Sequence, residues 1–156
     1  MKSFSFIMFK PDALERELVD VILERFKAEN FTIEAVGCKL ATEELILTHY
    51  EEPMSRVKGL RENALNSLTG KYLIPVIVSL ENEDAIEKVT KIVGKTNPPA
   101  AEVGTIRRDF GEDSFEKADK ENRFLNNLIH RCDDKEAYNR EIKLWFNEII
   151  YNKYKA

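Results

Sequence analysis

Apolar residues along the chain follow two spacings that alternate several times. Strands are predicted where short apolar runs are bounded by turn residues, and helices where apolar residues recur about every three or four positions. The predicted strands cover residues 4–9, 31–40, 72–80 and 124–129. The predicted helices carry apolar stripes at 18–26, 45–50, 60–68, 85–93 and 138–149. The resulting order is β-α-β-α(α)-β-α-β-α.

Residues at the ends of these segments have the character of caps and breakers. Thr42 precedes two glutamates and suits a helix N-cap, and Asp133 or Asp134 suits the start of the last helix. Gly94 is placed to end the helix before it. Pro75 lies inside the third strand. Because proline cannot donate to a sheet ladder, an edge position or a bulge is predicted there.

Two segments show no clear pattern. Lys95–Arg123 contains two prolines, two glycines and a highly charged stretch from Glu112 onward. A structureless connection of this length is unusual in a compact domain and is often functional. The last residues, 151–156, are polar, and we expect them to lie over the surface.

The element order favours an α/β (α+β) fold of the ferredoxin-like type. In that arrangement a split β-α-β unit forms a four-stranded antiparallel sheet covered by helices, which we expect on one face. No internal repeat or linker interrupts the chain. Residues 1–156 therefore form a single domain.

Composition narrows the class of protein. The chain has 156 residues, of which 43% are hydrophobic and 33% charged, a composition typical of a globular protein. Its net charge of −4 argues against a specific nucleic-acid partner. Two cysteines form neither a disulfide framework nor a four-thiolate zinc site. They fit a reducing compartment, so we expect the cytoplasm. No apolar run approaches the roughly 18 residues of a membrane span, so no membrane partner is expected.

His130 is the first candidate for chemistry. It is one of two histidines and directly follows an apolar run. A histidine at a strand-to-loop edge is held from one side and open from the other, which suits a nucleophile. An ordinary boundary residue is the alternative. A metal site from His49, His130, Cys38 and Cys132 would require these scattered residues to converge, and none is expected.

Three fragments contain groups that suit phosphate. Lys10 directly follows the first strand, Gly94–Pro98 carries a threonine, and Gly104–Phe110 carries two arginines. The planar fork of arginine donates two parallel hydrogen bonds to phosphate oxygens. None of the fragments is a P-loop or a G-x-G-x-x-G motif. Taken singly, each is better explained by solvated charges or a turn.

Together with two C-terminal motifs, these fragments resemble the nucleoside diphosphate kinases. The matching motifs, in the family's order, are Lys10-Pro11-Asp12, Gly94–Pro98, Gly104–Phe110, Asn127-x-x-His130 and Glu141–Phe146. The resemblance implies ping-pong transfer of the γ-phosphoryl group of a nucleoside triphosphate (ATP) to a nucleoside diphosphate, through a phosphohistidine. It also implies Mg²⁺ on the nucleotide and a homo-oligomer, either a hexamer or a tetramer.

The resemblance assigns roles to particular residues. His130 is the nucleophile, Glu141 orients its ring, and Lys10 completes the catalytic group. The residues that match phosphate- and ribose-binding positions are Lys10, Tyr50, Thr96, Arg107 and Asn127. Asp133 matches an acidic position close to the nucleotide's metal. The attacking nitrogen must be neutral, which an ordinary histidine pKa of ~6.5 permits.

The sequence departs from the family near the histidine. Arg131 and Cys132 stand where glycine and serine are usual. Arg131 is expected either to add a phosphate contact or to crowd the site. Cys132 replaces a hydroxyl beside the acid, and a thiol is a weaker donor. Thr90 stands where the family has a phosphate-binding arginine, and Lys88 or Lys91 is expected to compensate.

Two further departures concern the nucleotide's base and a loop. The family stacks the base on a phenylalanine, but no aromatic residue lies between Tyr50 and Tyr72, so Val57 or Leu60 is expected to give a weaker apolar surface. Residues at about 111–123 form an insertion near the site.

These departures leave two alternatives to an active kinase. One is a catalytically impaired family member that senses or binds nucleotide. A ferredoxin-like RNA-binding module is weaker, because it would need a basic face.

Overall fold

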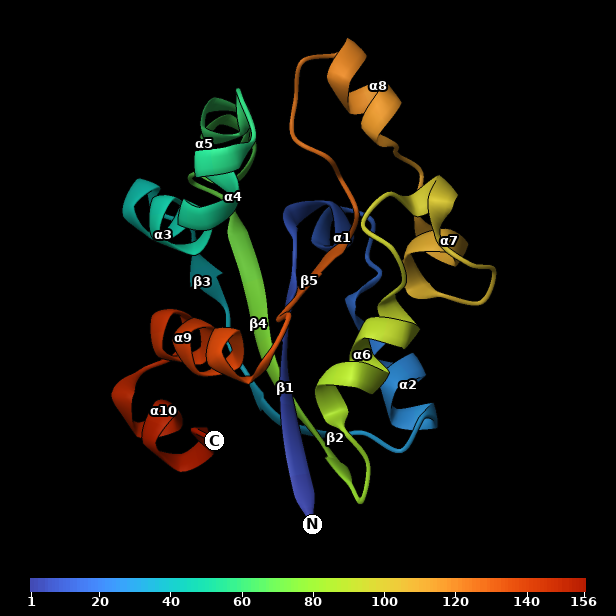
Figure 1. Ribbon diagram of the computed structural model, residues 1–156, viewed down its shortest axis with the longest axis vertical. Helices are drawn as coiled ribbons and strands as arrows, with labels where there is room; N and C mark the ends of the chain where they lie inside the picture. Colours follow the sequence, from blue (N-terminus) through green and yellow to red (C-terminus); the bar gives the residue numbers. More distant parts are fainter.

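The computed structural model describes residues 1–156 and is built on an antiparallel sheet in the strand order β2-β4-β1-β5 (Figure 1). The strands are β1 Lys2–Phe9, β2 Thr32–Val36, β3 Lys39–Leu40, β4 Tyr72–Glu81 and β5 Ile129–Arg131. The short β3 pairs with β4 beyond the end of β2. This order is that of the split β-α-β arrangement, so the predicted ferredoxin-like fold is confirmed.

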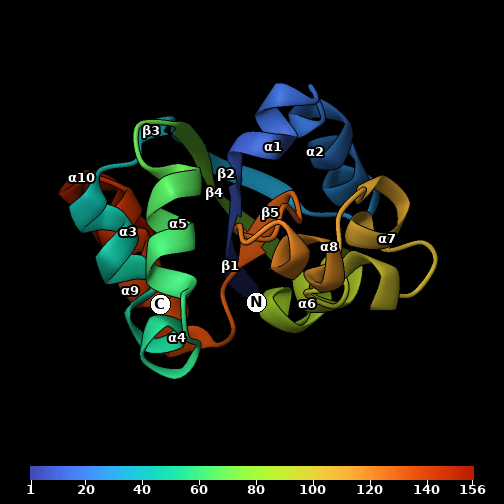
Figure 2. The same cartoon turned by 90° about the horizontal axis from the view of Figure 1, so that it is seen from above.

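Helices cover both faces of the sheet, so the prediction that they lie on one face was wrong (Figure 2). The helices are α1 Pro11–Glu15, α2 Val19–Ala28, α3 Glu43–His49, α4 Glu51–Arg56, α5 Leu60–Leu68, α6 Ala85–Val93, α7 Ile106–Phe110, α8 Phe115–Lys120, α9 Lys135–Trp145 and α10 Glu148–Tyr154, with a 3-10 turn at Pro98–Ala100. Strand β1 explains the two layers. Its alternating side chains are apolar on both sides: Phe6 and Met8 enter one core, and Ile7 and Phe9 the other.

Pro75 lies in a central strand, so the predicted edge position was wrong. Strand β4 pairs with β1 on one side and with β2 and β3 on the other. Pro75 stands opposite the break between β2 and β3, where its carbonyl accepts a hydrogen bond from the Gly37 amide at 2.8 Å. The missing proline N–H therefore falls where the neighbouring ladder is already interrupted.

The predicted helix boundaries are largely correct. The Thr42 hydroxyl accepts a hydrogen bond from the Leu45 amide at 3.2 Å, and Asp134 caps α9 by accepting from the Ala137 amide at 2.7 Å. The last predicted helix, however, ends at Trp145, and a separate helix, α10, begins at Glu148. Ile149 is therefore exposed and is not part of the buried stripe predicted over 138–149.

The polar tail is also better ordered than predicted. Tyr154 is buried, and its carbonyl accepts a hydrogen bond from the Tyr138 hydroxyl at 2.8 Å. Helix α10 therefore packs against α9 instead of lying loosely over the surface.

The segment Lys95–Arg123, which shows no clear pattern in the sequence, contains a 3-10 turn and two helices. Helix α8 has only Phe115 and Ala118 as apolar residues, too few for a visible stripe. The segment is closed by Asp113, which accepts hydrogen bonds from Arg123 at 2.6 and 2.8 Å and from the Asn126 amide at 2.9 Å. This bidentate ion pair connects Asp113, before α8, to Arg123, after it.

We expect Asp113→Asn to lower the free energy of unfolding by about 1–3 kcal/mol, because it removes a charged acceptor from a part-buried arginine. Burial of Asp113 opposes ionisation, but the hydrogen bonds from Arg123 and Asn126 outweigh it and lower the pKa of Asp113 to about 2. The stabilisation is therefore present above pH ~4, the ordinary range of aspartate, and is lost as the pH falls through 2. Urea denaturation at pH 7 measures the loss. Glu116→Gln, at an exposed position of the same segment, is the matched control, and an equal midpoint in both variants would contradict the prediction.

Candidate active site

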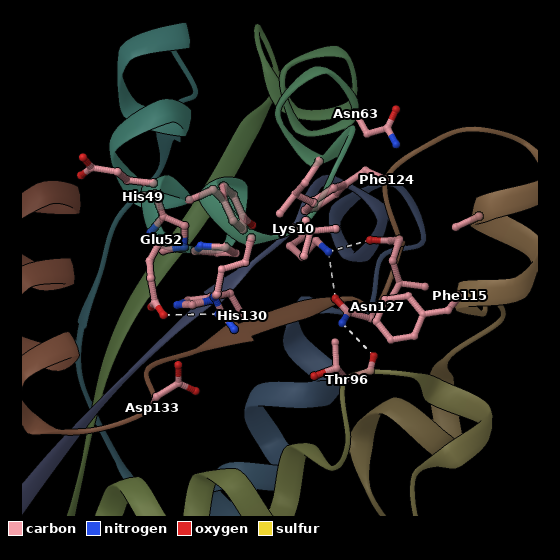
Figure 3. A pocket seen from close by; sticks show the side chains of 18 of the residues that line it. Lys10, His49, Glu52, Asn63, Thr96, Phe115, Phe124, Asn127, His130 and Asp133 are labelled. Carbon is pink, nitrogen blue, oxygen red and sulfur yellow. Dashed lines mark hydrogen bonds and ion pairs between the residues drawn. The ribbon is translucent and has the colours of Figure 1, made fainter.

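A cavity of about 990 Å³ lies at the end of the sheet remote from the N-terminus, with α4 and α5 on one side and α8 on the other (Figures 1 and 3). Every residue assigned to the site from the sequence lines this cavity. These residues are Lys10, Tyr50, Thr96, Arg107, Asn127, His130, Asp133 and Glu141. They come from different strands, helices and loops, so only the fold brings them together.

His130 lies in β5 and faces the cavity (Figure 3). Its Nε2 atom is 2.5 Å from Oε1 of Glu141, which α9 presents. Because this contact occupies Nε2, Nδ1 is the ring nitrogen left without a protein partner. A neutral ring that donates from Nε2 carries its lone pair on Nδ1, which is the form that a nucleophile needs.

The backbone immediately before β5 departs from the strand predicted over 124–129. Leu128 has a φ of 74°, a left-handed conformation that is costly for a residue with a side chain, so β5 begins only at Ile129. The Leu128 carbonyl accepts from the Lys10 amide at 2.9 Å, and its amide donates to Oδ2 of Asp12 at 3.0 Å. Both backbone groups of the strained residue are thus held by the Lys10-Pro11-Asp12 motif, which fixes the entry into β5.

Lys10 is buried at the end of β1 and points toward the cavity (Figure 3). Its Nζ donates to the Leu125 carbonyl and to Oδ1 of Asn127, both at 2.8 Å, and lies 4.5 Å from the centre of the Phe124 ring. Burial lowers the pKa of Lys10 to about 8, so the ammonium is still charged at neutral pH. Two of its N–H groups are used by the protein, and one remains for an anion.

Arg107 of α7 supplies a second buried cation. Its guanidinium donates to the backbone carbonyls of Gly94, Asn127 and Ile129. Gly94 has a φ of 88°, and a Cβ there would lie 2.6 Å from Oγ1 of Thr105, so only glycine lets α6 end this close to α7. Burial and the neighbouring charge of Arg131 lower the pKa of Arg107 to about 10, which leaves it charged. Lys10 and Arg107 thus create a positive pocket in an acidic protein.

Three predicted residues connect these groups to the rest of the site. The Asn127 side chain donates from Nδ2 to the Thr96 carbonyl at 2.9 Å (Figure 3). Tyr50 follows α3 and packs edge-on against Phe124, with ring centres 5.5 Å apart. Burial raises the pKa of Tyr50 above its ordinary value, so its hydroxyl stays protonated and able to donate.

Glu141 is buried, and its second carboxylate oxygen, Oε2, has no hydrogen-bond partner. Burial raises the pKa of Glu141 to about 7. The expectation that Cys132 acts as a weak donor beside this acid was wrong. The Cys132 sulfur lies 3.4 Å from Oγ of Ser5 and 3.4 Å from the Phe6 amide, because the side chain turns toward β1. Glu141 therefore relies on its contact with His130 alone.

His49 packs against His130, with ring centres 4.4 Å apart, and was considered from the sequence only as a metal ligand. The Trp145 indole donates to Nδ1 of His49 at 3.0 Å, which places the His49 proton on Nε2. Burial lowers the pKa of His49 to about 3, so it stays neutral. The sequence signal that could have identified His49 as a residue of the site is its position directly before Tyr50, which was predicted to lie there.

A metal centre at these histidines is not favoured by the geometry. His49, His130 and Glu141 bring ligand atoms within 4.8 Å of one another. However, the hydrogen bonds described above occupy Nδ1 of His49 and Nε2 of His130. Of the four residues weighed from the sequence, the two histidines come together, but Cys38 is exposed and Cys132 is buried against β1, so neither thiol joins them.

The basic residues of α6 do not reach the cavity. The Thr90 hydroxyl donates back to its own helix, Lys88 pairs with Glu83 at 3.2 Å, and Lys91 pairs with Glu87 at 2.9 Å. The expectation that Lys88 or Lys91 replaces a phosphate-binding arginine was wrong, since surface glutamates hold both side chains.

The end of the cavity away from His130 has apolar surfaces on both sides. Val57 and Leu60 contribute from α4–α5, as expected, and Phe115 of α8 and Phe124 after that helix contribute from the opposite side. Phe115 lies beside Asn127 in Figure 3 and is half exposed. Neither aromatic was expected in the site, because no helix was predicted around Phe115 and Phe124 was predicted only as a strand residue.

Comparison with known proteins places this site in a family. The model of the family described as "Nucleoside diphosphate kinase" matches residues 4–150. The chain belongs to the nucleoside diphosphate kinase family. The resemblance inferred from the motifs is thereby confirmed, and so are the activity and enzyme class that it implied: the protein is a phosphotransferase that acts on nucleoside diphosphates.

Individual relatives agree over nearly the whole chain. The nucleoside diphosphate kinase of Methanocaldococcus jannaschii is 39% identical over 148 residues, which cover 95% of this chain and 96% of the relative. That of Clostridium perfringens is 37% identical, covering 96% and 94%. The crystal structure of an NDP kinase from Pyrobaculum aerophilum is 29% identical, covers 96% of this chain and 98% of that one, and superposes with a TM-score of 0.82. These comparisons give no support to a family member that has lost catalysis. Among the helices of this nucleoside diphosphate kinase, none has the length and apolar character that crossing a membrane requires.

Proposed function

We propose that His130 carries the phosphoryl group between nucleotides. The observation that supports this most directly is the free Nδ1 atom on a ring held through Nε2 by Glu141. In the first half-reaction the Nδ1 lone pair attacks the γ-phosphorus of ATP. The bond to the bridging oxygen breaks, and ADP leaves with that electron pair. In the second, a terminal oxygen of another nucleoside diphosphate attacks the same phosphorus and the electron pair returns to Nδ1.

The surrounding residues stabilise charge and fix position. Lys10 and Arg107 neutralise the equatorial phosphate oxygens, which is the main protein contribution to phosphoryl transfer. Tyr50, Thr96 and Asn127 hold phosphates and ribose. Glu141 keeps the imidazole proton on Nε2 and offsets the positive charge of the phosphorylated ring.

The nucleotide is proposed to bind with Mg²⁺. Asp133 lies at the rim of the cavity, and one of its oxygens pairs with Arg131 at 2.7 Å, which leaves the other available. One protein carboxylate fits the needs of a Mg²⁺ ion whose remaining ligands are phosphates and water. When bound, the ion supplies further charge neutralisation.

Assembly and compartment are also proposals. Edge strand β2 and its neighbours expose the apolar residues Val36, Leu40 and Tyr72, which supports association of several copies, as a hexamer or tetramer. Light scattering on the protein as it elutes from a size-exclusion column would give the number of copies in the assembly. The two free thiols support residence in the cytoplasm.

A labelling experiment tests the proposed mechanism. The protein is incubated with γ-labelled ATP and Mg²⁺, freed of nucleotide, and then chased with GDP. We expect acid-labile, alkali-stable label on the protein that moves to GDP during the chase. Direct transfer to GDP with no labelled protein at any time would contradict a phosphohistidine intermediate.

A further inference from the structure

Arg131 directly follows the nucleophile on β5, and its side chain lies on the opposite face of the strand. Side chains two residues apart on a strand share a face. Ile129 belongs to the core that contains Val89 and Val93 of α6. Arg131 therefore lies on the same side as α6 and lines the cavity from there.

The guanidinium of Arg131 is incompletely paired. Nη1 donates to Oδ1 of Asp133 at 2.7 Å, but Nε is buried and has no hydrogen-bond partner. The Asp133 side chain is 82% exposed, so this ion pair is largely solvated and contributes little. A buried, unpaired N–H of a charged group is unfavourable unless a ligand satisfies it.

The surroundings indicate what that ligand is. Arg131 and Arg107 both line the cavity, and the charge of Arg131 is one cause of the lowered pKa of Arg107. Two guanidinium groups that repel one another are stabilised by an anion between them. Helix α6 offers no cation there, because Thr90 is turned onto its own helix.

We propose that Arg131 binds the terminal phosphate of the nucleotide together with Arg107, so that strand β5, rather than α6, supplies the second guanidinium of the phosphate site. This assignment rests on the proposed function, because it places the phosphate at His130. Arg131 then acts while the γ-phosphoryl group passes from the bridging oxygen to Nδ1, by donating hydrogen bonds to the equatorial oxygens over which the charge is spread.

The test compares Arg131→Gln, Arg131→Lys and the double variant Arg131→Gln/Thr90→Arg with the wild type. Single-turnover labelling with γ-labelled ATP measures the chemical step, and calorimetry with a non-hydrolysable ATP analogue and with ADP measures binding. We expect Arg131→Gln to slow labelling about 10- to 100-fold, the effect of losing charge-assisted hydrogen bonds. It should weaken binding of the triphosphate analogue more than that of ADP. Lysine should restore part of the rate, as should the arginine introduced on α6.

Arg61→Gln is the matched control, because Arg61 is an exposed arginine outside the cavity. Thermal melting checks that each variant is folded. If Arg131→Gln does not fold, Arg131→Lys decides, with an expected slowing of a few fold. If the folded variants are labelled at rates within twofold of the wild-type rate, the role of Arg131 is overturned and the proposed function is left intact. A wild-type protein that takes no label would overturn both.

Discussion

We expect His130→Ala to abolish the labelled protein intermediate and to reduce phosphoryl transfer by at least about 10⁴-fold, because no other group in the cavity can replace the nucleophile. His49 is the only alternative histidine, but its Nδ1 accepts from Trp145 and its Nε2 carries the proton. Neither of its nitrogens offers a free lone pair to phosphorus. The measurement is acid-labile label after incubation with γ-labelled ATP, together with the steady-state rate of GTP formation.

Two comparisons separate lost chemistry from lost binding. His130→Ala should still bind ADP, because Lys10 and Arg107 are held by backbone carbonyls and Asn127 rather than by His130. In the matched variant His49→Gln, labelled protein should still form. Label that persists in His130→Ala and disappears in His49→Gln would exchange the roles of the two histidines.

Much of the site could be predicted from the sequence because phosphoryl transfer requires a recognisable set of side chains. Lys10, Arg107 and His130 each lie in a short motif, and the fold then brings the motifs into one cavity. The positions of most strands along the chain were likewise predictable, since they are apolar runs between turn residues.

The failures have local physical causes. Leu128 is apolar and reads as part of a strand, but contacts from Lys10 and Asp12 hold it at a positive φ. Helix α8 exposes most of its length, so it needs few apolar residues and leaves no periodic signal. Lys88 pairs with Glu83 just before its own helix and, at 4.0 Å, with Glu29 at the end of α2, and helix periodicity reveals neither contact.

The orientation of Cys132 illustrates a further limit. Its place in the motif suggested a donor beside Glu141, but the Cys132 side chain, directly after β5, lies against Ser5 instead. This leaves one oxygen of Glu141 without a donor, and burial then raises the pKa of that carboxyl. The raised pKa of Glu141 should therefore affect the pH dependence of the reaction.

We expect Glu141 to set the acid limb of that dependence. Burial and the charges of Arg107, Lys10 and Arg131 lower the pKa of His130 well below its ordinary value, so the ring is neutral throughout the working range. Burial raises the pKa of Glu141 to about 7. As the pH falls through 7 the carboxyl gains a proton that it donates to Nε2, and the ring proton moves to Nδ1, where it blocks attack. Above pH 8, Lys10 loses its charge, because burial lowers its pKa to about 8. The profile of kcat/KM, which reports the free enzyme, should therefore be bell-shaped with limbs near 7 and 8.

Glu141→Gln should lower kcat/KM by about 10²- to 10⁴-fold, because the glutamine amide donates to Nε2 and stabilises the tautomer with the proton on Nδ1, as in triads with the wrong tautomer. It should also remove the acid limb while retaining the alkaline limb of Lys10. The pH profile of kcat/KM between 5 and 9 measures both effects. Glu136→Gln, at an exposed position of the same helix, is the matched control and should leave the profile unchanged. An acid limb that persists in Glu141→Gln would assign that limb to His130 instead. Glu141 would then act only by holding the ring in place.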